Sequence, residues 1–317
     1  MVIKSLHIGR LTVKNNVFLA PLAGFSNRAF RQICSELGAG LTFTEMVSAK
    51  GLKYNNRQTC ELLKTSDAEQ IKAAQLFGAD PSIMREACES KHLEPFDIVD
   101  INMGCPVPKV FNNGEGSALL NDVHLAEKIV SECVRSGKTV TVKMRKGVKK
   151  GETSALDLAK AVANAGASLI TVHGRTREDY YSGDVDFEII KKIKESVDVP
   201  VIANGGIFSV SDAEKIVNET GADGIMLARG ALFKPELFSR ILCESDTFKD
   251  KKALINRHID LLLQDYTETV AIKSMRKQLA FYVHGIRGSK AAKLKIFSSE
   301  YADEIREIIS ELDFQTQ

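Results

Sequence analysis

The stretch Asp97-Ile98-Val99-Asp100-Ile101-Asn102-Met103-Gly104-Cys105-Pro106 joins a short, mostly apolar run to a polar turn that contains glycine and proline. The first five residues have the length and composition of a buried β-strand. Gly104 and Pro106 leave little room for regular structure after it. If this strand belongs to a parallel barrel, Cys105 lies on the face where active sites form. Its thiol is then a candidate acid or nucleophile rather than core filling.

Similar apolar runs recur along the chain and alternate with amphipathic helical patterns. Repeated strand–helix units predict an α/β fold of the TIM (β/α)8 barrel type. An open, doubly wound sheet is the alternative, which the strand count and the lack of a G-x-G-x-x-G turn after the first strand disfavour. In one predicted helix, Ser211 and Glu214 have the spacing of a capping box. The predicted strands are 17–20, 41–43, 71–76, 97–101, 139–144, 168–172, 199–203 and 224–227, and the helical patterns include 125–135, 155–165, 187–196 and 211–220.

Two segments flank the predicted barrel. Residues 6–13, around Gly9 and Arg10, have the pattern of a hairpin before the first barrel strand. From about residue 245 the strand signals stop, and helical patterns follow. We therefore expect a barrel over residues 1–243 and a small all-helical C-terminal domain over residues 244–317. The helices expected in that domain are 251–266, 272–282 and 302–312.

Composition limits the class of protein. The 317 residues are 44% hydrophobic and 26% charged, with a net charge of +2, so a nucleic-acid surface would need local clustering of cations. The six cysteines form no C-x-x-C pair, and no histidine stands at zinc-ligand spacing. The N-terminus lacks a signal-peptide pattern, and no apolar run is long enough to span a bilayer. We expect a monomeric cytoplasmic protein without a metal site.

Polar or glycine-rich groups follow nearly every predicted strand. Gly205 and Gly206 follow the seventh strand, where TIM barrels commonly bind phosphate, and Arg229 after the eighth could add a charged donor. Lys143 would place a cation in the barrel mouth, which suits an anionic ligand such as a reduced flavin. Gln75 offers a donor and an acceptor to an amide-like ring edge, and His173 could donate to a ligand oxygen.

A basic segment lies in the predicted helical domain. Between residues 273 and 295 there are seven lysines and arginines and no acidic residue, with aromatic side chains interleaved. Such a run is often only a solvated face, but its length and lack of acids favour contact with phosphates. The seven cations are Lys273, Arg276, Lys277, Arg287, Lys290, Lys293 and Lys295.

Taken together and in order, these stretches resemble the tRNA-dihydrouridine synthases, flavin-dependent reductases of uridine in the tRNA D-loop. The segment 275–282 is similar to the bacterial B-type subgroup. The matching stretches are 20–31 (APLAGFSNRAFR), 75–78 (QLFG), 102–106 (NMGCP), 142–145 (VKMR), 172–176 (VHGRT), 203–207 (ANGGI) and 221–224 (GADG).

The resemblance implies an FMN-dependent enzyme that uses NADPH to reduce the C5–C6 bond of uracil, at position 17 if the protein is of the B type. Hydride would pass from flavin N5 to C6, and Cys105 would deliver a proton to C5. It also implies a tRNA substrate, with Asn102, Arg145, Tyr180 and His173 facing the uracil. The acid-free basic run predicts that Lys290 and Lys293 contact the RNA. The FMN-binding residues would be Pro21, Leu22, Ala23, Gln75, Lys143, His173, Asn204, Gly205, Gly206, Ala228 and Arg229.

Three other functions stay open at this stage. A flavin barrel similar to the dihydroorotate dehydrogenases would share the phosphate grip, Lys143 and a reactive cysteine, but it would not need a basic C-terminal domain. A phosphate-handling barrel without flavin, such as a sugar-phosphate isomerase, would share only the glycine-rich turns. A non-catalytic RNA-binding barrel would not need the polar groups at the strand ends.

Overall fold

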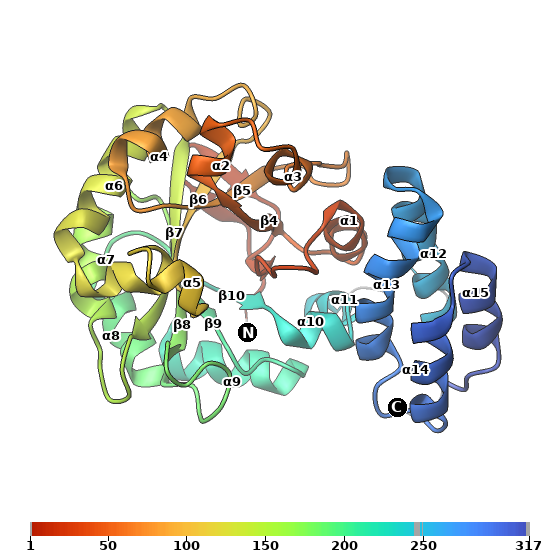
Figure 1. The fold of residues 1–317 in the computed structure, drawn as a ribbon. Coiled ribbons are helices and arrows are strands. Elements are labelled where there is room, and N and C mark those ends of the chain that lie inside the picture. The colour runs from red at the N-terminus through yellow and green to blue at the C-terminus, as the bar shows by residue number, and fades with distance from the viewer. Residues whose placement is uncertain (1, 244–247, 249, 315–317) are drawn as a thin grey trace.

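Eight parallel strands close into a barrel, as predicted. The computed structural model describes residues 2–243, 248 and 250–314 (Figure 1). The strands follow one another around the barrel in chain order, and β10 closes it by pairing with both β9 and β3. The barrel strands are β3 (Val17–Leu19), β4 (Leu41–Ser48), β5 (Lys72–Phe77), β6 (Ile98–Met103), β7 (Thr139–Gly147), β8 (Ile170–Thr176), β9 (Val201–Asn204) and β10 (Gly224–Leu227).

Four strands, β4, β6, β7 and β8, run two or more residues beyond their predicted ends. Asn102 pairs with Lys143 in register, and Arg145 pairs with His173. Asn102, Arg145 and His173 were expected just after the strands, but they lie within β6, β7 and β8. Lys143 was expected inside its strand and lies there. The side chains of Asn102 and Arg145 form hydrogen bonds with Gln75 and with the Gly104 carbonyl. The backbone continues its parallel pairing at these positions, beyond the apolar core. Strand residues hold side chains in more constant directions than loop residues do, which favours a preorganised site.

An outer layer of helices covers the barrel, and the longer ones bury apolar residues in the core cluster that the strands share. The predicted start of one helix is wrong: Ser209, not Ser211, is the N-cap of α9, and its hydroxyl accepts from the Asp212 N–H at 3.1 Å. Ser211 lies inside the first turn. The elements of this layer are α1 (Arg28–Glu36), α2 (Ala49–Lys53), α3 (Arg57–Glu61), α4 (Pro81–Cys88), α5 (Pro108–Phe111), the 3₁₀ helix η1 (Gly116–Asn121), α6 (Val123–Arg135), α7 (Ala155–Asn164), α8 (Phe187–Ser196), α9 (Val210–Thr220), α10 (Arg229–Phe233) and α11 (Leu237–Leu242).

The predicted hairpin is present as β1 (Leu6–Ile8) and β2 (Leu11–Val13), which pair antiparallel. Its buried residues Leu6, Ile8 and Val13 belong to the same apolar cluster as side chains from inside the barrel, including Phe18 and Phe43. This cluster fills the barrel interior from the amino-terminal side. The carboxyl ends of the strands are therefore left for polar side chains.

The C-terminal part is helical, as predicted, and lies on one side of the barrel (Figure 1). It contains α12 (Lys251–Asp265), α13 (Glu268–Tyr282), α14 (Ser289–Ser298) and α15 (Ala302–Ser310). Helix α14 was not predicted, because its sequence is rich in lysine and only Ala292 and Ile296 of it are buried. The expected boundary at residues 243 and 244 borders residues 244–247, which lie outside the described residues.

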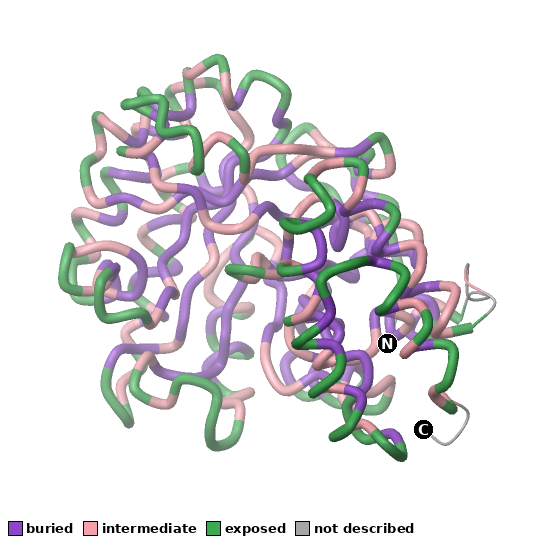
Figure 2. The backbone as a smooth tube through the Cα atoms, turned by 45° about the vertical axis from the view of Figure 1, so that its right-hand side comes forward, coloured by how far each residue is buried: buried purple, intermediate pink, exposed green. Residues whose placement is uncertain are grey.

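The helical part shares its apolar core with the barrel. Buried residues of α12, α13 and α15 belong to the same cluster as the helices of the outer layer, and Figure 2 shows buried backbone in both parts. Polar contacts add to this junction: the Arg28 guanidinium lies 2.6 Å from the Asp265 carboxylate, and Gln278 donates to the Leu232 carbonyl at 2.9 Å. Within the described residues, every helix is too short or too polar to cross a membrane.

Candidate active site

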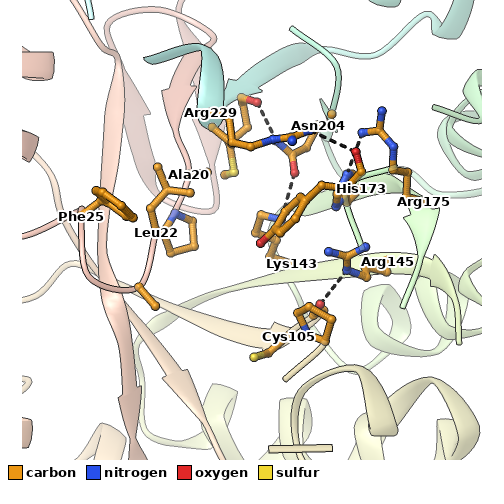
Figure 3. A pocket seen from close by; sticks show the side chains of 18 of the residues that line it. Ala20, Leu22, Phe25, Cys105, Lys143, Arg145, His173, Arg175, Asn204 and Arg229 are labelled. Atoms are coloured by element: carbon orange, nitrogen blue, oxygen red, sulfur yellow. Dashed lines mark hydrogen bonds between the residues drawn. The ribbon is translucent and has the colours of Figure 1, made fainter. Parts of the chain in front are cut away.

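A cavity of about 380 Å³ opens at the carboxyl end of the barrel (Figure 3). Its volume is within the range of small-molecule and cofactor sites. Every candidate residue predicted in the barrel lines it. These are Pro21, Leu22, Ala23, Gln75, Asn102, Cys105, Lys143, Arg145, His173, Tyr180, Asn204, Gly205, Gly206, Ala228 and Arg229.

Two glycines after β9 bring bare backbone to the cavity wall. Gly205 has a φ of +119°, and a Cβ built on it would lie 2.8 Å from Cδ2 of His173. Gly206 has a φ of +72°. Neither position accommodates a side chain without strain. The Arg229 guanidinium lies beside this turn, 4.7 Å from the ring centre of Tyr181, so a cation and accessible backbone face the same space.

Lys143 places an amine in the cavity, where its hydrogen-bond partner among the described residues is an amide and not a carboxylate. Its Nζ donates to Oδ1 of Asn204 at 3.0 Å, and Nδ2 of Asn204 donates to the Met226 carbonyl at 2.7 Å. Burial and then the neighbouring Arg145 lower the pKa of Lys143 from 10.5 to about 8. An anionic ligand would relieve this unfavourable charge, and the amine is therefore suited to bind one.

Cys105 is 7% exposed and sits in a turn that is held on both sides. Its N–H donates to Oδ1 of Asn102 at 2.8 Å, and its carbonyl accepts from the Ser117 hydroxyl at 2.7 Å. Burial raises the pKa of the Cys105 thiol above its ordinary value. The sulfur is therefore protonated at neutral pH, which suits a proton donor better than a nucleophile.

Arg145 ties two loops together at the cavity mouth. Its Nε donates to the Gly104 carbonyl at 2.9 Å, and Nη1 donates to the carbonyls of Thr176 and Tyr180 at 2.7 and 2.8 Å. The turn that carries Cys105 is thereby fastened to the loop after β8. A large part of the Arg145 donor capacity is used within the protein, which indicates a positioning role in addition to the expected contact with a substrate.

His173 is buried among cations. Burial and then Lys143, Arg145, Arg175 and Arg229 hold its pKa well below the usual range, so its imidazole is neutral at physiological pH. Its Nε2 lies 3.5 Å from Nη1 of Arg175. Arg175 was not predicted as a site residue, although its position two residues after His173 on a strand places both side chains on one face.

Several aromatic and apolar lining residues were also not predicted. Phe25, after β3, and Phe281 of α13 meet edge to face with ring centres 5.4 Å apart, and both line the cavity. No local sequence signal brings a residue of the helical part to the barrel mouth. The further lining residues that were missed include Met46, Val107, Tyr181, Phe208 and Leu232.

Lys290 and Lys293 are not brought to this cavity. Both are on α14, where Lys290 is exposed and Lys293 is partly buried. Figure 1 shows α14 on the far side of α13 from the barrel. If these lysines bind a ligand, they contact a part of it that lies well outside the barrel mouth.

Comparison with known proteins decides the family. A family model described as "Dihydrouridine synthase (Dus)" matches residues 18–316. The chain belongs to the dihydrouridine synthase family. It is 37% identical over 295 residues to a "Probable tRNA-dihydrouridine synthase" of Rickettsia conorii, with 90% of this chain and 89% of that protein covered.

A protein of Pasteurella multocida named "tRNA-dihydrouridine synthase B" is 37% identical over 291 residues, covering 89% of this chain and 88% of its own. The similarity to relatives of this name confirms both the family and the B-type subgroup expected from the sequence. Among solved structures, morphinone reductase aligns with a TM-score of 0.57 at 14% identity, over 79% of this chain and 91% of its own. At that identity the likeness supports the barrel fold alone.

Proposed function

We propose that this protein is a tRNA-dihydrouridine synthase that reduces the C5–C6 bond of a D-loop uridine with FMN and NADPH. The observation that carries the proposal is one cavity in a Dus-family barrel that joins a buried, protonated Cys105 to a cationic wall. Relatives named tRNA-dihydrouridine synthase B support the tRNA substrate. Position 17 is our proposal from the resemblance of segment 275–282 to the B type.

The cavity residues fit a flavin mononucleotide. The turn at Gly205 and Gly206 leaves no room for a Cβ beside His173, and with Arg229 it forms an anion-binding wall for the phosphate. Lys143, whose charge is unfavourable in the free cavity, is placed to balance negative charge on the ring. When bound, the flavin supplies the hydride for C6, and NADPH restores it.

Cys105 provides the other hydrogen. Saturation of the uracil C5–C6 bond requires one hydride and one proton, and the protonated thiol supplies the proton to C5. The thiolate that remains regains a proton from solvent. The turn held by Asn102, Ser117 and Arg145 keeps the sulfur at the cavity wall. A thiol of strongly lowered pKa would be ionised at neutral pH and would have no proton to donate.

Cys105→Ala tests this role. We expect the variant to bind FMN as the unaltered protein does, with the same visible absorption, and to lose nearly all dihydrouridine formation on unmodified tRNA, by about 10²-fold or more. Cys243→Ala, which removes an exposed thiol, is the matched control and is expected to retain activity. Full reduction of tRNA by Cys105→Ala would overturn the assignment. A protein without a flavin band would instead contradict the cofactor.

We further propose that residues 244–317 form the tRNA-binding part, with Lys290 and Lys293 contacting phosphates. Changing both to glutamate is expected to weaken tRNA binding and to lower the slope of log K against log salt by about 0.7–0.9 for each lost phosphate contact. The control reverses Lys128 and Lys160, which are exposed on α6 and α7. Equal affinities and slopes in the two double variants would exclude α14 as the RNA-binding surface.

A further inference from the structure

A row of buried polar side chains leads from the barrel interior to the Cys105 turn. The Thr141 hydroxyl donates to Oδ1 of Asp100 at 2.6 Å, and Nε2 of Gln75 donates to Oδ2 of Asp100 at 2.7 Å. Nδ2 of Asn102 then donates to Oε1 of Gln75 at 2.7 Å. Asp100 and Thr141 are fully buried, and Gln75 is 1% exposed. These groups come from three adjacent strands, β5, β6 and β7.

The row ends on the backbone of the turn. Oδ1 of Asn102 accepts from the N–H of Cys105 at 2.8 Å and from the N–H of Gly104 at 3.1 Å. The hydrogen bonds of both backbone N–H groups thus depend on the orientation of the Asn102 side-chain amide. An inverted Asn102 would present its NH₂ group to two backbone N–H donors, and both hydrogen bonds would be lost.

The carboxylate of Asp100 can only accept hydrogen bonds, whereas the amides and the hydroxyl in this row can both donate and accept. Ionised Asp100 accepts at both oxygens, so Gln75 must face it with the NH₂ group. The Gln75 oxygen is then left for Asn102, which must donate to it. Each amide therefore takes its orientation from the previous group. Burial raises the pKa of Asp100 to about 6, opposed by the hydrogen bonds from Gln75 and Thr141 and then by Lys143. The carboxyl group is therefore ionised at pH 8.

We propose that Asp100 is a positioning residue, which acts through Gln75 and Asn102 to fix the turn that carries Cys105. The inference deepens the proposed function and rests on it for its catalytic meaning, because the turn matters to the reaction only if Cys105 donates the proton. Asp100 itself lies below the cavity wall and touches neither the thiol nor the cavity. Its charge sets the direction of the hydrogen bonds, and its shape alone would not.

Exchanging the Gln75 amide and the Asp100 carboxylate separates the effect of the charge from the effect of side-chain packing. In Asp100→Asn, the new NH₂ group either inverts Gln75 and Asn102 or faces the Thr141 hydroxyl, so the row loses its single orientation. In Gln75→Glu, two carboxylates meet at the former 2.7 Å contact. In the double variant D100N/Q75E, the amide introduced on β6 donates to the carboxylate introduced on β5, which still accepts from Asn102. The original direction returns with nearly the same side-chain volumes.

The experiment is hydrogen–deuterium exchange at pH 8 on the purified full-length protein, read at the peptide that contains the Gly104 and Cys105 amides. Each single variant is expected to exchange there about tenfold faster, and D100N/Q75E to return to within about threefold of the unaltered protein. Asp97→Asn, the same substitution just before the start of β6, is the control and is expected to leave this peptide unchanged. A double variant that exchanges as fast as its worse single variant would overturn the proposal.

If D100N does not fold, the comparison of Q75E with D100N/Q75E decides the question in the same way. Turnover on tRNA provides the second readout: we expect kcat to fall about tenfold in D100N, whose side chain lies outside the cavity lining. The two failures are distinguishable. If the double variant does not restore slow amide exchange, the role of Asp100 is refuted. If exchange is restored but the unaltered protein does not reduce tRNA, the proposed function is refuted and the hydrogen-bond direction is still established.

Discussion

Replacing Lys143 by methionine should make the protein more stable while it loses activity. The amine lies in the cavity with Asn204 as its hydrogen-bond acceptor, and its pKa falls from 10.5 to about 8. At about 1.4 kcal/mol per pH unit, this corresponds to roughly 3 kcal/mol of unfavourable free energy for the ammonium in the folded protein. Methionine has a similar length and no charge, so the substitution removes this contribution.

Two effects reduce the gain. Lys143 keeps some exposure to the cavity, and water there screens part of the penalty. The lost hydrogen bond to Asn204 subtracts about 1 kcal/mol. We therefore expect Lys143→Met to raise the free energy of unfolding by about 1–2 kcal/mol at pH 7. The measurement is urea denaturation of protein from which any bound cofactor has been removed.

The pH dependence gives the sharper test. The folded protein releases the Lys143 proton near pH 8, whereas the unfolded chain holds it until about pH 10.5. Between these values the unfolded state binds more protons, and the unaltered protein gains stability as the pH rises. The advantage of Lys143→Met should therefore shrink from pH 7 to pH 10. A variant that is less stable at pH 7, or an advantage that does not change with pH, would refute the reasoning.

Lys146→Met is the matched control on the same strand. Its amine forms an ion pair with Asp186 at 3.0 Å near the surface, so its loss is expected to lower stability at pH 7 by less than about 1 kcal/mol. If Lys143→Met raises the free energy of unfolding and Lys146→Met lowers it, the charge of Lys143 is identified as destabilising and retained for ligand binding.

Two further substitutions test the scaffold and the phosphate wall. Glu69→Gln is expected to lower the free energy of unfolding by about 3–5 kcal/mol in urea denaturation. The fully buried Arg31 guanidinium lies 2.7 Å from Glu69 and would lose its counter-charge. A loss below about 1 kcal/mol would contradict this. Gly205→Ala is expected to weaken FMN binding about tenfold or more in a fluorescence titration, because its Cβ would meet the His173 ring at 2.8 Å with φ at +119°; unchanged affinity would show that the turn does not shape the site.

Local sequence patterns were sufficient for most of the barrel. The spacing of apolar residues and the polar residues at strand ends are short-range properties, so the eight strands and the hairpin could be located from runs of a few residues. The same reasoning found Cys105, Lys143 and the turn at Gly205, because the carboxyl ends of parallel strands converge in any such barrel. It failed for α14, whose lysine-rich surface hides the two buried residues that anchor it.

Contacts between distant segments could not be read in this way. That Phe281 lines the cavity depends on how α13 packs against α10, and that Arg145 binds the carbonyls of Thr176 and Tyr180 depends on the loop after β8. Each of these pairings joins residues far apart in sequence, and no local period encodes them.

Hydrophobic periodicity and the geometry of parallel strands act locally, so the barrel and the set of polar groups at its mouth follow from short stretches of sequence. The electrostatic cost and the hydrogen-bond orientation of those groups depend instead on contacts between distant segments. Burial makes the Lys143 ammonium unfavourable and raises the pKa of the Cys105 thiol. The row from Asp100 to the turn acquires a direction only when three strands lie side by side. Charge and hydrogen-bond polarity depend on the dielectric and the partners around a group, and these exist only in the folded chain.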